Sequence, residues 1–203
     1  MYLPQHFTES RLPVLHDAME RAGLAILVAA GADGLQATHL PLLLDRTNGS
    51  HGTLTGHLAR SNPLWRDLEA GLPALIIFSG PDAYVSPSWY PSKSMGGKAV
   101  PTWNYVAIHA SGPVSVFHDP QRLLRVVSDL TGRHEQGRNN PWSVEDAPAD
   151  YLRTQLVGIV GFEMIISRLE GKWKMSQNRS PEDRAGTRAG LRDEGRDDVA
   201  ALI

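Results

Sequence analysis

The spacing of hydrophobic residues predicts short strands and amphipathic helices in the first part of the chain. Apolar residues recur every three or four positions over residues 10–22, which predicts a helix. The continuous apolar run over 24–30 is too short for another helix, and turn residues at 31–34 lead into 35–45, so these segments are predicted to form a hairpin. Polar and apolar residues alternate within 52–58, which predicts a third strand.

A short helix and two more strands are expected next. Asn62 can cap a helix whose first residue is Pro63, and Gly71 can end that helix. Strands are predicted over 74–78 and 83–86, with a Ser-Gly-Pro-Asp turn between them.

A long loop is expected in the middle of the chain, because residues 87–101 contain three prolines, two glycines and two lysines. The elements expected after it are a strand over 103–117 broken at Gly112-Pro113, a helix from Asp119-Pro120 to about 134, a short helix over 148–157, a strand or bent strand pair over 159–176 with its break at Gly171, and a helix over 180–194 with a frayed tail to 203.

This order of elements favours a mainly antiparallel β-barrel with peripheral helices. The regular alternation of strands and helices that marks a doubly wound sheet is missing, and no G-x-G-x-x-G sequence follows a strand. The length of 203 residues fits one domain over residues 1–203 that includes the C-terminal helix at about 180–194.

Composition narrows the possible functions. The chain has 20 Lys and Arg against 22 Asp and Glu, a net charge of -2, which gives no overall attraction to nucleic acid. It contains no cysteine, so redox chemistry would need a bound cofactor. The first residues do not resemble a signal peptide and no apolar run is long enough to span a bilayer, so a cytoplasmic protein without a membrane partner is expected.

Metal and hydrolase chemistry find little support. None of the eight histidines is paired with another at metal-ligand spacing on a predicted helix, and His39, His57 and His109 fall on predicted strands. Structural histidines are therefore favoured, and no metal site is predicted. No G-x-S-x-G sequence marks a nucleophilic serine.

Four short segments combine polar and aromatic residues, at 56–63, 86–93, 100–105 and 171–179. Arg60, Ser61 and Asn62 precede a predicted helix start and have the donors that recognise phosphate. The residues that could contact a flat ring system and its electron-rich edge are Trp89, Trp103 and Trp173, with Lys172 or Lys174. Three alternative interpretations remain open. The tryptophans can simply pack in the core, Asn62 can simply cap a helix, and Lys172 and Lys174 can lie on the solvent-exposed face of an edge strand.

The last predicted helix carries a stripe of arginines at 184, 188, 192 and 196. Acidic residues interleave with this stripe, so a solvated face of ion pairs is favoured over a phosphate-binding face.

The same segments resemble the PaiB-type FMN-binding negative transcriptional regulator family. The matching strings are MYLP at 1–4, ATHLPL at 37–42, GHLARSNP at 56–63, SPSWYPSK at 86–93, VPTWNY at 100–105, RHEQGRNNPWSVEDAP at 133–148 and LEGKWKMSQNR at 169–179, followed by Arg184-Ala185-Gly186. They occur in the family's order over nearly the whole chain.

The resemblance implies a split β-barrel of the pyridoxamine-phosphate-oxidase-like kind, a homodimer that binds FMN, and a role in repressing genes for sporulation and secreted enzymes. It implies phosphate contacts from Arg60, Ser61 and Asn62, with Thr38 and His39 nearby. The remaining pocket residues that it implies are Trp89, Lys93, Trp103, Lys172, Trp173, Lys174 and Gln177, from one subunit or both.

Two functions stay open at this stage: a regulator that binds FMN without turnover, and a flavin-dependent oxidoreductase acting on a small molecule. The sequence shows no helix-turn-helix pair and no basic domain, so an indirect repressor role is favoured over direct contact with DNA.

Overall fold

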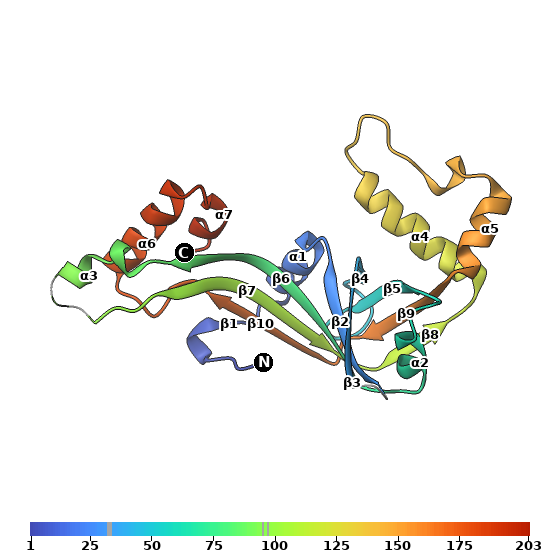
Figure 1. Ribbon diagram of the computed structural model, residues 1–203, viewed down its shortest axis with the longest axis horizontal. Coiled ribbons are helices and arrows are strands. Elements are labelled where there is room, and N and C mark those ends of the chain that lie inside the picture. Colours follow the sequence, from blue (N-terminus) through green and yellow to red (C-terminus); the bar gives the residue numbers. More distant parts are fainter. Residues whose placement is uncertain (32–33, 95, 97) are drawn as a thin grey trace. The chain divides into compact units, whose positions relative to one another are not determined.

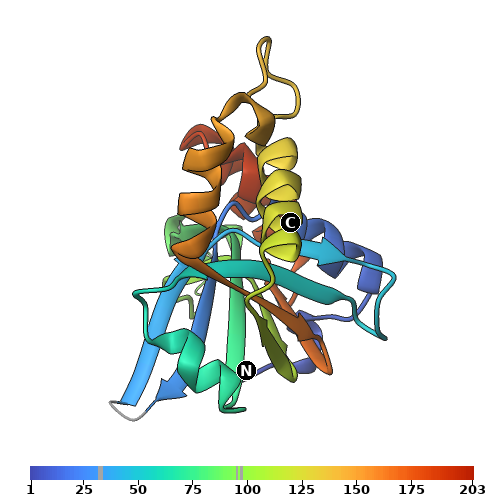
Figure 2. The ribbon, with the colours of Figure 1, turned by 90° about the vertical axis from the view of Figure 1, so that its right-hand side faces the viewer.

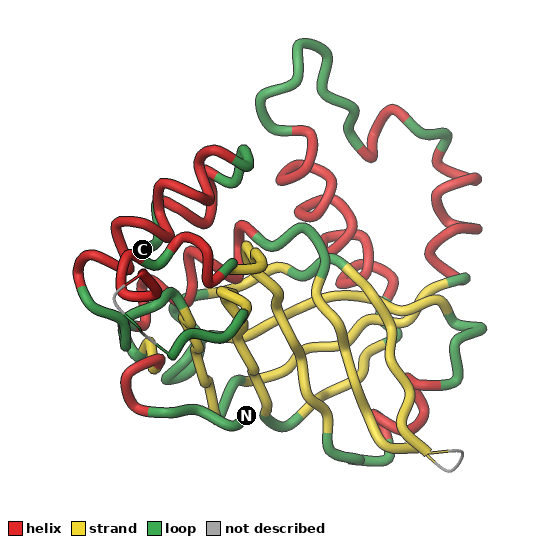
Figure 3. The backbone as a smooth tube through the Cα atoms, turned by 60° about the vertical axis from the view of Figure 1, so that its left-hand side comes forward, coloured by secondary structure: helices red, strands yellow, loops and turns green. Residues whose placement is uncertain are grey.

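A computed structural model describes residues 1–31, 34–94, 96 and 98–203 (Figure 1). It is mainly β, as expected, with two antiparallel sheets and several helices. The larger sheet has the order β1 (Thr8–Glu9), β10 (Arg168–Lys174), β7 (Thr102–Ser111), β6 (Ala74–Val85), β2 (Ala25–Gly31), β3 (Gly34–Leu40). The smaller sheet has the order β4 (Leu43–Asp45), β5 (Thr53–Ala59), β9 (Ile159–Ile165), β8 (Val114–Phe117). Figure 3 distinguishes these strands from the helices by colour.

Residue contacts divide the chain into two compact units. Unit 1 comprises residues 1–18, 79–108 and 170–203, and unit 2 comprises 19–78 and 109–169. Each unit joins segments that are far apart in sequence. The prediction of one domain over residues 1–203 stays a prediction.

Unit 2 contains the predicted hairpin, in which Ala25 pairs with Leu40 and Gly31 with Gly34. Of the turn predicted at 31–34, Ala32 and Asp33 lie outside the described residues. The predicted second strand over 35–45 is wrong in one respect, because it stops at Leu40 and β4 joins the other sheet. Pro41 between them lacks a backbone donor for a sheet, which explains the break.

Two helices cover part of the smaller sheet in unit 2. Helix α4 (Pro120–Glu135) is capped by Asp119, whose side chain accepts a hydrogen bond from the Arg122 amide, as the sequence predicts. Helices α4 and α5 (Ala149–Val157) lie side by side and both contact β9 (Figure 2). Their shared core is apolar and consists of Phe117, Leu123, Val126, Leu130 and Leu156 with surrounding partly buried residues.

Unit 1 includes η1 (Gln5–Phe7) and the pairing of β1 with β10, in which Thr8 lies opposite Lys172. One apolar core in unit 1 consists of Ala83, Val106, Met175, Leu191, Val199 and Ala200. Helix α6 (Pro181–Asp193) starts at the predicted cap, since the Ser180 hydroxyl accepts a hydrogen bond from the Asp183 amide at 3.2 Å.

Three predictions about where strands and helices begin and end are wrong. The strands predicted over 74–78 and 83–86 form one strand, β6. Its pairing with β2 ends at Phe78, so Pro81 lies beyond the paired part and its missing backbone donor removes no hydrogen bond to β2. The loop predicted over 87–101 contains η2 (Pro87–Trp89) and α3 (Pro91–Ser94). The tail predicted to fray forms α7 (Asp197–Ala200), with Val199 and Ala200 buried.

The break predicted at Gly171 is also misplaced. Strand β9 ends at Ile165 and β10 begins at Arg168, so Gly171 lies inside β10 opposite Glu9. A Cβ at Gly171 would come within 2.2 Å of Leu15 Cδ2. This glycine therefore permits a close approach of α1 (Leu12–Arg21) and does not form a turn.

Within the part of the chain that the structure describes, no helix has the length and apolar character needed to cross a bilayer.

Candidate functional site

Arg60, the first expected phosphate contact, donates hydrogen bonds to backbone carbonyls within unit 2. Its Nε donates to the Val157 carbonyl at 2.6 Å and its Nη2 to the Ile159 carbonyl at 2.9 Å. Its Nη1 lies 3.4 Å from His118 Nδ1. The guanidinium thus joins the end of β5 to the junction between α5 and β9. Its role as a phosphate contact stays a prediction.

Asn62 and Thr38 come together as expected, because Asn62 Nδ2 donates to Thr38 Oγ1 at 2.9 Å. Asn62 Oδ1 also accepts from the Leu64 amide at 3.1 Å, which fixes the start of α2 (Leu64–Glu69). The prediction that Pro63 is the first residue of this helix is wrong, because Pro63 lies at the cap position and the helix begins at Leu64. With only six residues, α2 provides no helix-terminal anion site. Ser61 and His39 are exposed.

A cationic pocket in unit 1 offers a more suitable set of donors. The residues that line it are Thr102, Asn104, Lys174, Ser176, Asn178 and Arg179, around a space of about 50 Å³. We call it the Lys174 pocket. Lys174 Nζ donates to Thr102 Oγ1 and to the Trp103 carbonyl, so this ammonium is held against β7.

The charge of the Lys174 pocket is uncompensated. Burial, followed by repulsion from Lys172 and Arg179, holds the pKa of Lys174 below its ordinary value. None of the described lining residues carries a carboxylate. Lys172 is buried, donates to the Tyr2 carbonyl at 3.1 Å, and lies over the ring of Tyr105. Bound phosphate would offset this repulsion and accept hydrogen bonds from the ammonium, hydroxyl and amide groups.

The backbone shape of the Lys174 pocket depends on a buried side-chain pair. Asn104 Nδ2 lies 3.1 Å from Ser176 Oγ, and both residues are buried. Ser176 has a φ of 62°, an uncommon conformation for a residue with a side chain. Gln177 stabilises this turn, since its side chain accepts from the Met175 amide at 2.7 Å and donates to the Trp173 carbonyl at 2.6 Å.

The aromatic candidates in unit 1 have different surroundings. Trp89 packs on α6, where a Cβ at Gly190 would lie 2.3 Å from its ring. Trp173 packs on the unit 1 core. Trp103 is exposed, and its ring meets the Tyr84 ring edge-on, with 6.1 Å between the ring centroids. Lys93 is exposed on α3. Of the three tryptophans, Trp103 therefore has the ring most accessible to a ligand.

Sequence reasoning selected Lys172, Lys174 and Gln177 but did not select Thr102 and Asn104 individually. Thr102 and Asn104 are the polar residues of the VPTWNY string, and their polar character could have marked them as candidate ligand contacts. Their importance depends on the pairing of distant segments, which places β7 next to β10.

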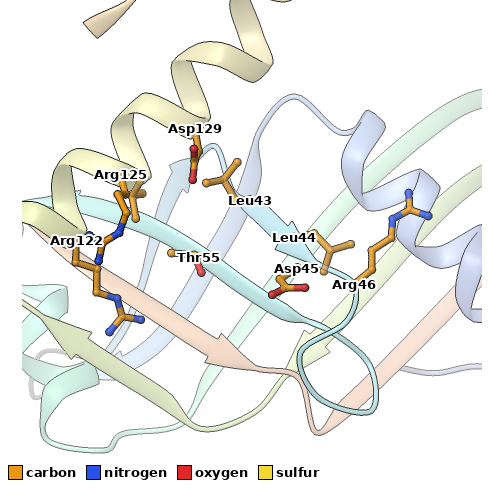
Figure 4. Close-up of a pocket in the computed structure, with 9 residues that line it drawn as sticks. Leu43, Leu44, Asp45, Arg46, Thr55, Arg122, Arg125 and Asp129 are labelled. Atoms are coloured by element: carbon orange, nitrogen blue, oxygen red, sulfur yellow. The ribbon is translucent and has the colours of Figure 1, made fainter. Parts of the chain in front are cut away.

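A wider and more open hollow lies in unit 2, between β4, β5 and α4 (Figure 4). Its volume is about 600 Å³. Of the three arginines that line it, Arg122 is paired with Glu163 and Arg46 with Glu20, while Arg125 faces a lining that also holds Asp45 and Asp129. This balance of charges makes the hollow less suitable for phosphate than the Lys174 pocket.

A metal site finds no support in the described residues, among which no group of three or more His, Cys, Asp or Glu side chains could hold a metal ion. Histidines 39, 57 and 109 lie on strands, as expected.

Comparison with known proteins identifies the class. The chain matches the family described as "Putative FMN-binding domain" over residues 1–168. It is 33% identical to protease synthase and sporulation protein PAI 2 of Bacillus subtilis, over 90% of this chain and 85% of that protein. An uncharacterized protein of Emericella nidulans is 32% identical over 97% of this chain and 92% of its own.

Solved structures show the same fold. A FAD and heme binding protein from Mycobacterium smegmatis superposes with a TM-score of 0.62 at 17% identity, covering 88% of this chain and 78% of that one. The flavocytochrome Anf3 from Azotobacter vinelandii gives 0.62 at 11% identity, covering 88% and 75%.

The fold is thus the split-barrel type shared with flavoproteins. The chain belongs to the FMN-binding domain family, and this membership supports a flavin cofactor.

Proposed function

We propose that this protein is an FMN-binding, homodimeric, cytoplasmic negative regulator of transcription of the PaiB type. The observation that carries this proposal is the similarity to PAI 2, which extends over 90% of the chain and concerns a protein named for protease synthesis and sporulation. Similarity of that extent includes both the segment with Arg60 and most of the strands of both units.

The phosphate of FMN is proposed to bind in the Lys174 pocket. Lys174 and Arg179 supply positive charge, and Thr102, Ser176 and Asn178 supply neutral polar groups. Phosphate, with about two negative charges at neutral pH, matches this set better than any neutral group does. When bound, FMN supplies reversible two-electron chemistry and a visible absorbance.

In unit 2, Arg60 is proposed to act as a positioning residue. Its two hydrogen bonds to carbonyls at 157 and 159 hold β5 in place next to β9. Asn62 and Thr38, which are bonded to each other, and the exposed Ser61 and His39 remain candidates for contact with the flavin.

The arginines of the C-terminal region do not favour direct DNA binding. Arg184 donates to the Ile203 carbonyl, Arg196 pairs with Asp198 at 3.1 Å, and Arg192 lies 4.0 Å from Asp197. Two of the four arginines of the stripe thus pair with interleaved acidic residues. We therefore propose that repression depends on a partner, on FMN, or on both.

A genetic experiment tests the regulatory role. Transcripts are compared in a strain that lacks the gene, in the same strain complemented with the wild-type gene, and in the strain complemented with Lys174→Met. We expect a set of transcripts to rise on deletion, and to return to the starting level with the wild type but not with Lys174→Met. An unchanged transcript profile, together with repeated NAD(P)H-dependent reduction of bound flavin by the pure protein, would contradict a regulator and indicate an oxidoreductase.

A further inference from the structure

The open hollow between β4, β5 and α4 has no role in the function proposed above (Figure 4). All of its lining residues belong to unit 2. We call it the Arg125 hollow. Its volume of about 600 Å³ lies in the range that is typical of small-molecule sites. The hollow can therefore hold a ligand, and its charged side chains decide which kind.

One of the three lining arginines has a guanidinium that the protein does not use. Arg122 is bonded to Glu163, and Arg46 to Glu20. Arg125 is exposed on α4 and makes no hydrogen bond or ion pair with any residue that the structure describes. Its guanidinium is therefore available to a ligand in the hollow.

The two lining aspartates differ in the same way. Asp45 Oδ1 accepts from the Thr47 amide at 2.9 Å and from the Thr47 hydroxyl at 2.7 Å. Asp129 is exposed on α4 and has no hydrogen bond or ion pair within the described part of the chain. Arg133, one turn further along α4, donates to two backbone carbonyls instead. The Asp129 carboxylate is therefore available as well.

Arg125 and Asp129 lie one helical turn apart, which places their Cβ atoms about 5–6 Å from each other. No ion pair joins them in the described structure. The basic residue comes first in this pair, which is the less favourable order for an ion pair along a helix. A ligand with both charges can pair with both side chains at once.

Neutral side chains complete the wall of the Arg125 hollow. Val126 belongs to the apolar core beneath α4, and Leu43 packs against that core. Thr55 lies opposite Leu43 in the pairing of β4 with β5, so the two side chains share one face of the sheet. The Thr55 hydroxyl has no hydrogen-bond partner among the described residues, and it is not one of the unpartnered polar atoms that are cut off from solvent.

We propose that the Arg125 hollow binds a free α-amino acid with an apolar side chain, whose carboxylate pairs with Arg125 and whose ammonium pairs with Asp129. An α-amino acid carries both charges at neutral pH. Thr55 can donate a further hydrogen bond to the carboxylate, and Leu43 and Val126 receive the apolar side chain. A simple anion would pair with the guanidinium but would also meet the carboxylate of Asp129.

Isothermal titration calorimetry of the full-length protein compares L-leucine with two analogues. N-acetyl-L-leucine lacks the ammonium, and 3-methylbutylamine lacks the carboxylate. We expect the wild type to bind L-leucine at least about tenfold more tightly than either analogue, the value of one hydrogen bond between charged groups. L-alanine should bind more weakly than L-leucine, because its methyl group leaves the apolar wall uncovered.

Two variants remove the charges at exposed positions with little change in shape. Arg125→Gln and Asp129→Asn should each weaken L-leucine by about tenfold. Arg125→Gln should not weaken 3-methylbutylamine, and Asp129→Asn should not weaken N-acetyl-L-leucine. The matched controls are Arg153→Gln and Asp150→Asn, at exposed positions of α5 outside the hollow, and they should leave the affinity for L-leucine unchanged. Thermal unfolding of each variant shows that it is folded.

Failure of L-leucine to bind, or an affinity for L-leucine that is unchanged in either Arg125→Gln or Asp129→Asn, would overturn the proposal. Equal affinity for L-leucine and N-acetyl-L-leucine would also overturn it, because the hollow would then be a site for simple anions. Competition between L-leucine and FMN would assign the hollow to the flavin and have the same consequence. FMN binding measured on the same samples reports separately on the proposed function, so the two can fail independently.

Discussion

Asn104 and Ser176 are bonded to each other in the interior of unit 1, although 72 positions separate them in sequence. Asn104 lies on β7 and Ser176 in the turn that follows β10, so this bond links two walls of the Lys174 pocket. The pair both shapes the pocket and satisfies two buried polar groups.

Ser176→Ala should lower the free energy of unfolding by about 1–3 kcal/mol, because it leaves the buried Asn104 amide short of a partner. Urea unfolding of Ser176→Ala, Asn104→Ala and the double variant measures the coupling between the two residues. We expect a coupling of about 0.5–3 kcal/mol. Strict additivity of the two single effects would contradict the interaction.

Arg60→Ala should lower the free energy of unfolding by about 1–3 kcal/mol, because two charge-assisted hydrogen bonds to carbonyls are lost. The exposed Arg153 on α5 is the control, and Arg153→Ala should change stability by less than about 0.5 kcal/mol. The ratio of FMN to riboflavin affinity should stay unchanged in Arg60→Ala. A selective loss of FMN affinity would instead assign the phosphate to Arg60.

Two glycine substitutions in helices should have opposite effects. Gly190→Ala in α6 should destabilise the protein by about 1–3 kcal/mol, because the added methyl would overlap the Trp89 ring. Gly132→Ala in α4, where nothing lies within 4 Å, should stabilise it by about 0.5–1 kcal/mol. Thermal unfolding compares the two, and equal effects would contradict the packing of Trp89 against α6.

Burial lowers the pKa of His57, which predicts a loss of stability in acid. The unfolded chain takes up a proton near the ordinary pKa of 6.5, whereas the folded chain does so only at lower pH. The free energy of unfolding therefore falls as pH decreases from 6.5 to the folded-state pKa, and this contribution is absent above that range. Urea unfolding at about pH 7.5 and pH 5.5 should show a smaller decrease for His57→Leu than for the wild type. Equal decreases would contradict the shift.

Much of the fold could be predicted from local patterns. The hairpin of β2 and β3, the cap of α4 at Asp119 and the cap of α6 at Ser180 follow from turn and capping residues, whose effects act over a few positions. Gly80-Pro81 and Gly171 misled the prediction, because their roles depend on neighbours distant in sequence. Gly80, for example, lies where Val106 would collide with a side chain.

The candidate site could be predicted only in outline for the same reason. Lys174 was predicted as a cation for the electron-rich edge of a flat ring, but its repulsion by Arg179 and its bond to Thr102 depend on the turn at Ser176 and on β7. Arg60 was selected for its charge, and only the structure shows that β9 and the end of α5 take up its donors.

The most direct test of the central claim is the comparison of FMN with riboflavin, which differ only by the phosphate. We expect visible-absorbance titrations to show that the wild type binds FMN at least about tenfold more tightly than riboflavin, the value of one charge-assisted contact. Lys174→Met should remove this preference, and Lys98→Met, at an exposed position, should keep it. Equal affinity of the wild type for both flavins, or a preference that survives Lys174→Met, would contradict the account.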